Sequence, residues 1–379
     1  MPGAIARIQA GTRPSDPRHL THSPTDAAKE LRLSRWSAAG EESLVRRIRR
    51  IFPPPPAGVR VAIGDDAACV RLSGGEDLVL TTDQMVEGVH FRRSTHPPEL
   101  LGARALTVNL SDVAGMGARP RWFLLSLFLP QDLPDRYLEG LLAGLSTEAR
   151  RRRVSLVGGN LTASPVLAVD ICLAGSLPRG TKPLLRSGGR AGDLLFVTGS
   201  LGGSALGLEL LQEGWRLTGQ RAARRGQGAR LAAAALRSHL APAPDYTLAR
   251  NLARRRIASA AIDLSDGLST DLHRLCLASG TGARIETERL PVSEAALRLR
   301  GKAAAIGMAL HGGEDYQLLF AVPPRKIEAL ERLARAPRIT RIGVLTSSPK
   351  RLVAVSAGKA VPLIPAGHDH LRGGGTRRR

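Results

Sequence analysis

Apolar and polar residues follow two different periods along this chain, and together they predict a mixture of strands and helices. Residues 122–129 and 317–322 are short apolar runs bounded by turn residues, which is typical of buried strands. Residues 99–116 and 135–151 place their apolar side chains at helical spacing. Both halves of the chain mix the two kinds of element. We therefore predict an α/β (α+β) fold in which mixed sheets are covered by helices.

A stretch rich in Gly, Pro and Arg, residues 175–192, separates the two halves. We predict a basic, disordered extension over residues 1–38, an N-terminal domain over 39–178, a C-terminal domain over 179–371 and a disordered Arg/Gly tail over 372–379. The further expected strands are residues 59–63, 78–82, 154–157, 166–174, 284–286 and 339–345, and the further expected helices are residues 41–52, 231–240, 294–306 and 326–335.

The most informative stretch is Asp263-Leu264-Ser265-Asp266-Gly267, which follows an apolar strand and precedes leucines at helical spacing. Ser265 or Asp266 is expected to cap that helix. A helix N-terminus attracts phosphate, and two nearby carboxylates attract a divalent cation. The stretch is therefore compatible with a magnesium-nucleotide site. Taken alone, it is equally compatible with a capped helix start whose Asp is solvated.

Further acids are expected where predicted elements end, which strengthens the case for a metal site. Asp65 and Asp66 follow one strand, and Asp83 follows another. Asn109 and Asp112 share one face of an otherwise apolar helix, so this face is either wet or holds a cation. Mg²⁺ prefers oxygen ligands, and scattered carboxylates suit it. The chain has no Gly-x-x-x-x-Gly-Lys-Ser/Thr, which excludes a P-loop enzyme.

Composition narrows the possible partners and the compartment. The net charge is +22, and the basic residues are spread widely without interleaved aromatics. We interpret this as an arginine bias that suits anionic small molecules; an arginine-rich RNA-binding protein is the alternative. Three distant cysteines argue against a zinc site or a disulfide framework. Without an apolar run of about 18 residues or a signal peptide, we expect a cytoplasmic protein that does not enter a membrane.

Five motifs in this order and spacing resemble bacterial thiamine-monophosphate kinase. They are Gly64-Asp65-Asp66-Ala67, Thr82-Asp83 with Val86-x-Gly88-x-His90-Phe91, Asn109-Leu110-Ser111-Asp112, Asp263-x-Ser265-Asp266-Gly267-Leu268 and Gly312-Gly313-Glu314-Asp315-Tyr316. Each motif alone is modest, but the ordered set is specific, and the match runs from about residue 40 to about residue 370. The resemblance implies the two-domain fold of the aminoimidazole-ribonucleotide-synthetase superfamily and a homodimer formed through the N-terminal domains.

This family transfers the γ-phosphoryl group of ATP to thiamine monophosphate in direct in-line fashion, with several Mg²⁺ ions and without a catalytic base. The resemblance implies three sets of residues. The metal ligands are Asp66, Thr81, Thr82, Asp83, Asp112, Asn160, Asp263 and Asp266; the ATP-binding residues are Gly159, Asn160, Arg186 and Ser265; the residues that face thiamine monophosphate are His90, Glu314 and His368.

Two positions depart from the family pattern. Asn160 stands where an Asp is usual, so one magnesium site is expected to be weaker. His368 stands where a Tyr often stacks on thiamine. Apart from the resemblance, His90 lacks metal-ligand spacing and reads as a structural histidine. Another ATP-dependent enzyme of the same superfamily is the alternative, and the block from Thr82 to Phe91 favours the thiamine branch.

Overall fold

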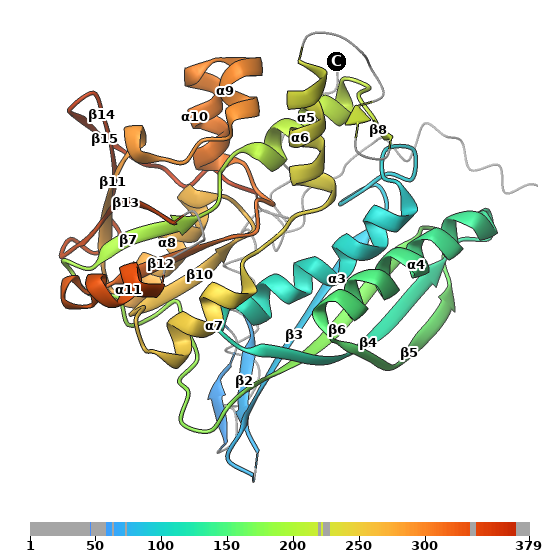
Figure 1. Cartoon of the computed structure of the whole chain (residues 1–379), viewed down its shortest axis with the longest axis horizontal. Helices are drawn as coiled ribbons and strands as arrows, with labels where there is room; N and C mark the ends of the chain where they lie inside the picture. Colours follow the sequence, from blue (N-terminus) through green and yellow to red (C-terminus); the bar gives the residue numbers. More distant parts are fainter. Residues whose placement is uncertain are drawn as a thin grey trace, which may run out of the picture.

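The computed structural model describes Arg46 and residues 58–368, except residues 63, 73, 219–220, 223–227 and 334–338. The predicted extension over residues 1–38, the helix over 41–52 (apart from Arg46) and the tail over 372–379 lie outside the described residues. Within the described part, two large sheets carry helices on their faces (Figure 1). This confirms the predicted α/β architecture of mixed sheets covered by helices.

The N-terminal half forms a six-stranded sheet in the order β1-β2-β3-β6-β4-β5. Its pairings are antiparallel except for β4 and β5, which run parallel. Two long helices, α3 and α4, lie side by side on one face of this sheet (Figure 1). The bounds are β1 Val59–Val61, β2 Ala68–Arg71, β3 Asp77–Val86, α3 Pro98–Gly115, β4 Arg119–Leu129, α4 Asp135–Arg152, β5 Ser155–Ala163 and β6 Ala168–Leu177.

Helices α3 and α4 approach each other closely because glycines stand at their crossing. A Cβ atom on Gly102 of α3 would lie 1.9 Å from the carbonyl oxygen of Leu141, and one on Gly144 of α4 would lie 1.9 Å from that of Glu99. Any larger side chain would therefore push the helices apart. The close crossing fixes the position of α3, which carries several of the polar residues described below.

The C-terminal half forms a seven-stranded sheet in the order β10-β12-β7-β13-β11-β14-β15, and a two-stranded ribbon of β8 and β9. The strands are β7 Leu194–Thr198, β8 Leu217–Thr218, β9 Arg221–Ala222, β10 Ala260–Leu264, β11 Gly282–Glu286, β12 Gln317–Val322, β13 Ile339–Thr346, β14 Leu352–Ser356 and β15 Lys359–Pro362. The α-helices are α5 Gly203–Gln212, α6 Ala229–Leu240, α7 Tyr246–Arg254, α8 Leu268–Ser279, α9 Glu294–Arg300, α10 Lys302–His311 and α11 Ile327–Leu333; Thr287–Arg289 and Pro324–Lys326 are short 3₁₀ turns.

The two halves share one continuous core. Leu106 and Val113 of α3 belong to the same buried cluster as Leu318 and Phe320 of β12. Helix α3 also contacts β10 directly. The helix that covers the first sheet therefore packs on the second sheet as well, and residues from both halves meet along its length.

Several elements differ from expectation. Strand β3 continues past Asp83 to Val86, because β6 pairs with it over its whole length; Asp83 therefore lies within a strand and not at its end. Strand β5 includes the glycine pair that was expected to leave the strand. The helix expected over residues 294–306 is interrupted at Gly301, which has a φ of +79°. Helix α7 and strands β2, β14 and β15 were not predicted.

Candidate active site

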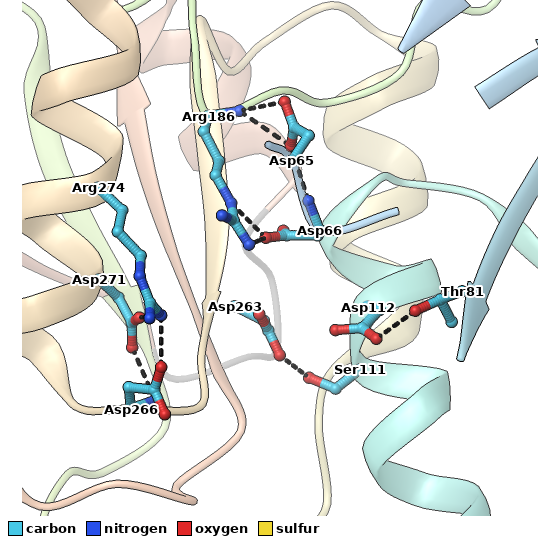
Figure 2. Close-up of polar contacts among 10 residues, drawn as sticks. All are labelled: Asp65, Asp66, Thr81, Ser111, Asp112, Arg186, Asp263, Asp266, Asp271 and Arg274. Atoms are coloured by element: carbon cyan, nitrogen blue, oxygen red, sulfur yellow. Dashed lines mark hydrogen bonds and ion pairs between the residues drawn. The ribbon is translucent and has the colours of Figure 1, made fainter. Parts of the chain in front are cut away.

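A cleft of about 1060 Å³ opens where the two halves meet. It contains eight of the residues that the motifs singled out: Asp83, His90, Asp112, Arg186, Ser265, Asp266, Glu314 and His368. Beside it lie Asp66 and Asp263, which Figure 2 shows facing the same space between α3 and the loop after β10. The motifs of the first and second halves therefore meet in one place.

Asp263 belongs to β10 and is almost fully buried. Its Oδ2 atom accepts a hydrogen bond of 2.7 Å from the hydroxyl of Ser111 on α3 (Figure 2). Burial, with the nearby carboxylate of Asp66, raises the pKa of Asp263 to about 7. A buried carboxylate held next to other carboxylates is unfavourable until a positive charge joins it.

The loop after Asp263 does not use the cap that we expected. Gly267, with a φ of 108°, precedes helix α8, and no side chain caps this end in the way predicted for Ser265 or Asp266. Instead, the buried Asp271 reaches back and accepts hydrogen bonds from the backbone N–H groups of Asp266 (3.1 Å) and Gly267 (3.0 Å). Arg274 then bridges Asp266 and Asp271, at 2.5 and 3.0 Å (Figure 2). Asp266 is thus free of capping and faces the cleft.

Asp66 and Asp65 form a second acidic group, held by one arginine. Arg186 contacts Oδ1 of Asp66 through Nε at 2.7 Å and through Nη2 at 2.5 Å (Figure 2). Its backbone N–H also faces the carboxylate of Asp65. Burial and the charge of Asp66 raise the pKa of Asp65 to about 6. The other oxygen of Asp66, Oδ2, is buried without a hydrogen-bond partner.

Asp112 and Asp83 come from α3 and β3. The hydroxyl of Thr81 donates a hydrogen bond of 2.7 Å to Asp112. Burial, followed by the charges of Asp263 and Asp83, raises the pKa of Asp112 well above its ordinary value. Asn109, one turn earlier on α3, faces neither water nor the cleft: it is buried, and its amide donates to the carbonyl oxygen of Asp83 at 3.2 Å. Asn109 therefore anchors β3.

The acidic groups fit a hard cation in chemistry. Among the described residues, no three acidic, histidine or cysteine side chains stand close enough to hold a metal ion in their present positions. Yet every donor is an oxygen, the carboxyls raise one another's pKa values, and Asp66 Oδ2 lacks a partner. A divalent cation that prefers oxygen ligands would suit these donors, reduce the repulsion between the carboxylates and give Asp66 Oδ2 a partner.

Glu314, His90 and His368 line the same cleft, and we call the part around Glu314 the Glu314 end and the part around the aspartates the acidic end. The backbone N–H of Glu314 donates to Ser265 O at 2.7 Å, and that of Tyr316 donates to Leu264 O at 2.9 Å. The N–H of His368 donates to Asp266 O at 3.0 Å. The loops that carry the two ends are thus hydrogen-bonded to each other through their backbones.

Three predicted site residues lie elsewhere in this single chain. The hydroxyl of Thr82 points to the opposite side of β3 from Thr81 and donates to Asp170 and to Ile171 O. Gly159 and Asn160 lie on β5, the exposed edge strand of the first sheet, and the amide of Asn160 donates to Thr162 at 3.2 Å. None of the three lines the cleft.

Sequence reasoning missed several residues that complete the site. Ser111, Asp271 and Arg274 each contact a predicted ligand directly. Ser111 stands next to Asp112 in a motif, and Asp271 and Arg274 stand three residues apart in the helix that follows Asp266, so position and spacing offered a signal for them. Arg104 and His239 contact Glu314 from other elements; no local pattern points to them.

The chain matches two family models in sequence. Residues 64–177 match the model of the AIR synthase related protein, N-terminal domain, and residues 190–355 match that of the C-terminal domain. The thiamine-monophosphate kinase of Salmonella typhimurium is 36% identical over 336 residues, which cover 88% of this chain and 99% of the relative. That of Aquifex aeolicus is 37% identical over 266 residues, covering 70% of this chain and 81% of the relative.

Solved structures agree with these matches. A complex of AaThiL with AMPPCP and TMP superposes with a TM-score of 0.75 at 33% identity, covering 89% of this chain and 99% of that chain. A complex of the hydrogenase maturation protein HypE with ATP has a TM-score of 0.59 at 20% identity, which shows a shared fold alone. From its sequence and its fold, the chain belongs to the thiamine-monophosphate kinase family.

Proposed function

We propose that this protein phosphorylates thiamine monophosphate to thiamine diphosphate, with ATP as the phosphoryl donor. The observation that carries the proposal is the cleft itself, which is lined by carboxylates and arginines and also by Glu314 and two histidines. Membership of the family supplies the substrates, since its relatives are named for the kinase activity and AaThiL binds AMPPCP, an ATP analogue, together with TMP.

Magnesium is part of this proposal. Asp66, Asp83, Asp112, Asp263 and Asp266 would hold it, with Thr81 supporting Asp112. When bound, the ions neutralise the phosphates of both substrates and the charge that develops during transfer. Without such cations, five acids at one end of the cleft would repel a polyphosphate.

The side chains of the chain itself contribute binding and orientation. Arg186 and Arg274 line the cleft and hold Asp66 and Asp266, so their guanidinium groups stand beside the space proposed for the phosphates. Ser265, next to Asp266, is proposed to contact ATP. The acceptor is a phosphate oxygen that is already ionised, so no side chain needs to remove a proton. We therefore propose direct in-line transfer without a covalent enzyme intermediate.

The test is direct. Purified protein is incubated with ATP, MgCl₂ and thiamine monophosphate, and thiamine diphosphate is measured by chromatography after oxidation to fluorescent thiochromes. We expect product only when all three components are present. Absence of thiamine diphosphate with fully folded protein would contradict the proposal, and so would equal turnover in excess chelator.

We also propose that the protein forms a homodimer through the first sheet. Helices cover one face of this sheet, whereas the other face and the edge strand expose large apolar side chains. Trp122 and Leu124 of β4 are 39% and 46% exposed, and Leu161 of β5 is 71% exposed. Exposed apolar patches and unpaired edge strands are features of interaction surfaces. A second copy of the same sheet would cover both.

A dimer would give Gly159 and Asn160 a way to reach the nucleotide. In the paired strands, Gln84, Asp170, Ser126 and Asn160 lie in one row. With three strand spacings between them, Asn160 stands roughly 14 Å from Gln84 at the cleft. We propose that Gly159 and Asn160 serve the nucleotide site of the assembled dimer and not that of an isolated chain.

Light scattering after gel filtration tests the dimer. The native protein should elute with twice the mass of the chain, and Leu161→Asp should shift it to the mass of one chain. Leu142→Asp, on the outer surface of α4 and 39% exposed, is the matched control. A monomeric native protein would refute the proposal.

No helix within the described residues is long and apolar enough to cross a membrane. Location in the cytoplasm and the absence of specific nucleic-acid binding stay predictions.

A further inference from the structure

Glu314 occupies an unusual backbone position. It has a φ of +66°, and Tyr316, two residues on, has a φ of +48°. Such left-handed conformations are strained for residues with a Cβ atom and persist only where the surroundings impose them. Here Asp315, between them, accepts hydrogen bonds from the backbone N–H groups of Gly202 (2.6 Å) and Ser204 (3.0 Å). The loop is thus clamped so that the side chain of Glu314 faces the cleft.

Arg104 meets one carboxylate oxygen of Glu314 from the first half of the chain. It lies in α3, its side chain is 0% exposed, and its Nη2 donates to Glu314 Oε1. Its Nη1 faces His96 Nε2 at 3.4 Å. Among the described ion pairs, Glu314 is the acid that balances Arg104. A buried guanidinium is tolerated only with such a partner.

His239 meets the other oxygen from the second half. Its Nδ1 lies 3.3 Å from Glu314 Oε2 and 3.0 Å from the hydroxyl of Ser204. Burial and the neighbouring Arg104 lower the pKa of His239 to about 3, so the ring is neutral. A carboxylate only accepts, so the neutral ring can donate toward Glu314 only in the tautomer that carries its proton on Nδ1. The other nitrogen, Nε2, is buried without a hydrogen-bond partner.

The network is asymmetric toward the cleft. The side chain of Glu314 is 30% exposed, whereas those of Arg104 and His239 are 0% and 1% exposed. The carboxylate of Glu314 therefore faces the cleft, whereas Arg104 lies behind it and His239 borders the cleft with its side chain almost fully buried. Burial raises the pKa of Glu314, but the charge and hydrogen bond of Arg104 more than offset this and hold it at about 2.

We propose that Arg104 and His239 are positioning residues that fix the carboxylate of Glu314 at the substrate end of the cleft, and that they thereby set the affinity for thiamine monophosphate. The inference rests on the proposed function and adds two residues to it. Thiamine monophosphate offers an exocyclic amino group on its pyrimidine and a cationic thiazolium ring. A fixed carboxylate suits either group, since it accepts hydrogen bonds and attracts positive charge.

The first test compares two substitutions of His239. An Asn side chain can place its amide near the position of Nδ1 and donate a hydrogen bond, whereas Leu has similar bulk and no donor. We expect His239→Leu to raise KM for thiamine monophosphate about tenfold, with kcat and KM for ATP changed less than about twofold. His239→Asn should recover most of the affinity. Equal KM values for the Leu and Asn variants, or a parallel rise in KM for ATP, would overturn the inference.

The second test separates an effect of Arg104 on substrate affinity from an effect on the stability of the fold. Arg104→Met leaves Glu314 without its cation, so both the melting temperature and the affinity for thiamine monophosphate should fall. The double variant Arg104→Met/Glu314→Gln removes both charges and should regain the melting temperature but not the affinity. Arg152→Met is the matched control, because Arg152 pairs with the buried Glu148 and lies outside the residues lining the cleft. It should lower the melting temperature without changing KM.

The proposed function and the positioning role of Arg104 and His239 can be refuted separately. If the native protein makes no thiamine diphosphate, the proposed function is wrong. If the native protein is active and the double variant binds thiamine monophosphate normally, the Arg104–Glu314 pair is only structural and the inference alone is wrong. Should Arg104→Met not fold, the double variant and the two His239 variants still decide.

Discussion

The two ends of the cleft treat charge in opposite ways. At the acidic end, Asp112 and Asp263 lie near like charges, and burial together with those charges raises their pKa values. At the other end, Glu314 has a buried partner on each oxygen, and its pKa falls to about 2. The carboxylates of the acidic end are suited to positive charge that arrives with a ligand, whereas the charge of Glu314 is balanced by Arg104 before any ligand binds. The cleft is therefore preorganised at the Glu314 end only, and the following experiments test that difference.

Asp263→Asn should give the largest effect. If the acidic end works through cations, the variant should lose at least about a hundredfold in kcat, because one oxygen ligand loses its charge. In chelator, however, its free energy of unfolding should equal or exceed that of the native protein, since a repelling charge has gone. Activity assays and urea unfolding measure the two quantities. A strongly destabilised variant would mean that Asp263 is structural and that the two ends do not differ.

Glu314→Gln should behave in the opposite way. The substitution leaves Arg104 buried without a counter-charge, which typically costs about 3 kcal/mol. Urea unfolding in chelator measures the unfolding free energy of this variant, which is then compared with that of Asp263→Asn. Unchanged stability would show that Arg104 finds another partner and that the charges at the Glu314 end do not depend on one another for balance.

The pH dependence of stability reports on the same buried network. Arg104 can only donate, so His96 Nε2 carries the lone pair, and Nδ1 bonds with Thr95. Burial and then Arg104 lower the pKa of His96 from 6.5 to about 4. The unfolded chain therefore binds the proton first, and stability is present above pH 6.5 and is lost as pH falls toward 4.

Between pH 7 and pH 5 the contribution of His96 amounts to about 2 kcal/mol. His96→Gln keeps an acceptor for Arg104 but cannot be protonated, so its unfolding free energy should fall by about 2 kcal/mol less over this interval. Urea unfolding at the two pH values measures the difference. Parallel pH profiles for the native protein and the variant would mean that His96 is protonated in the folded protein as readily as in the unfolded chain.

Asn160→Asp should give the smallest effect. If the dimer brings Asn160 near the metal, an added carboxylate should lower the free Mg²⁺ needed for half-maximal rate by a few fold, corresponding to about 1 kcal/mol of Coulomb energy near a surface. Rate is titrated against free Mg²⁺ for both proteins. Coincident half-saturation points would remove Asn160 from the acidic end.

The sequence alone predicted elements and site residues correctly where neighbouring residues in the chain determine them. Strand β12 was predicted with the observed bounds, and motif residues such as Asp112 and Glu314 do line one cleft. The strand containing Gly159 was misjudged because glycine is a poor strand former by propensity, whereas pairing with β4 holds it in the strand. Likewise, Asp83 was expected at a strand end, but the pairing of β3 with β6 extends the strand beyond it.

The buried partners of Glu314 could not be predicted for a different reason. Arg104 is 210 positions away and sits in a mostly apolar helix, in which a single Arg is not an obvious partner for an acid. Nothing in sequence spacing distinguishes a buried arginine from the many exposed ones in a chain of net charge +22. Only tertiary packing decides which arginine faces an acid. The prediction that Ser265 or Asp266 caps helix α8 was wrong for a similar reason, since Asp271 accepts hydrogen bonds from the N–H groups of Asp266 and Gly267.

The backbone hydrogen bonds from Glu314 to Ser265 and from Tyr316 to Leu264 have a consequence for what the cleft can accept. They couple the loop that bears Glu314 to the loop that bears Asp266, so the two loops cannot move apart without breaking these bonds. We therefore expect turnover only for a substrate whose distance from ring to phosphate matches the spacing between the two loops. An analogue lengthened by one methylene between ring and phosphate should still occupy either end, but not both at once.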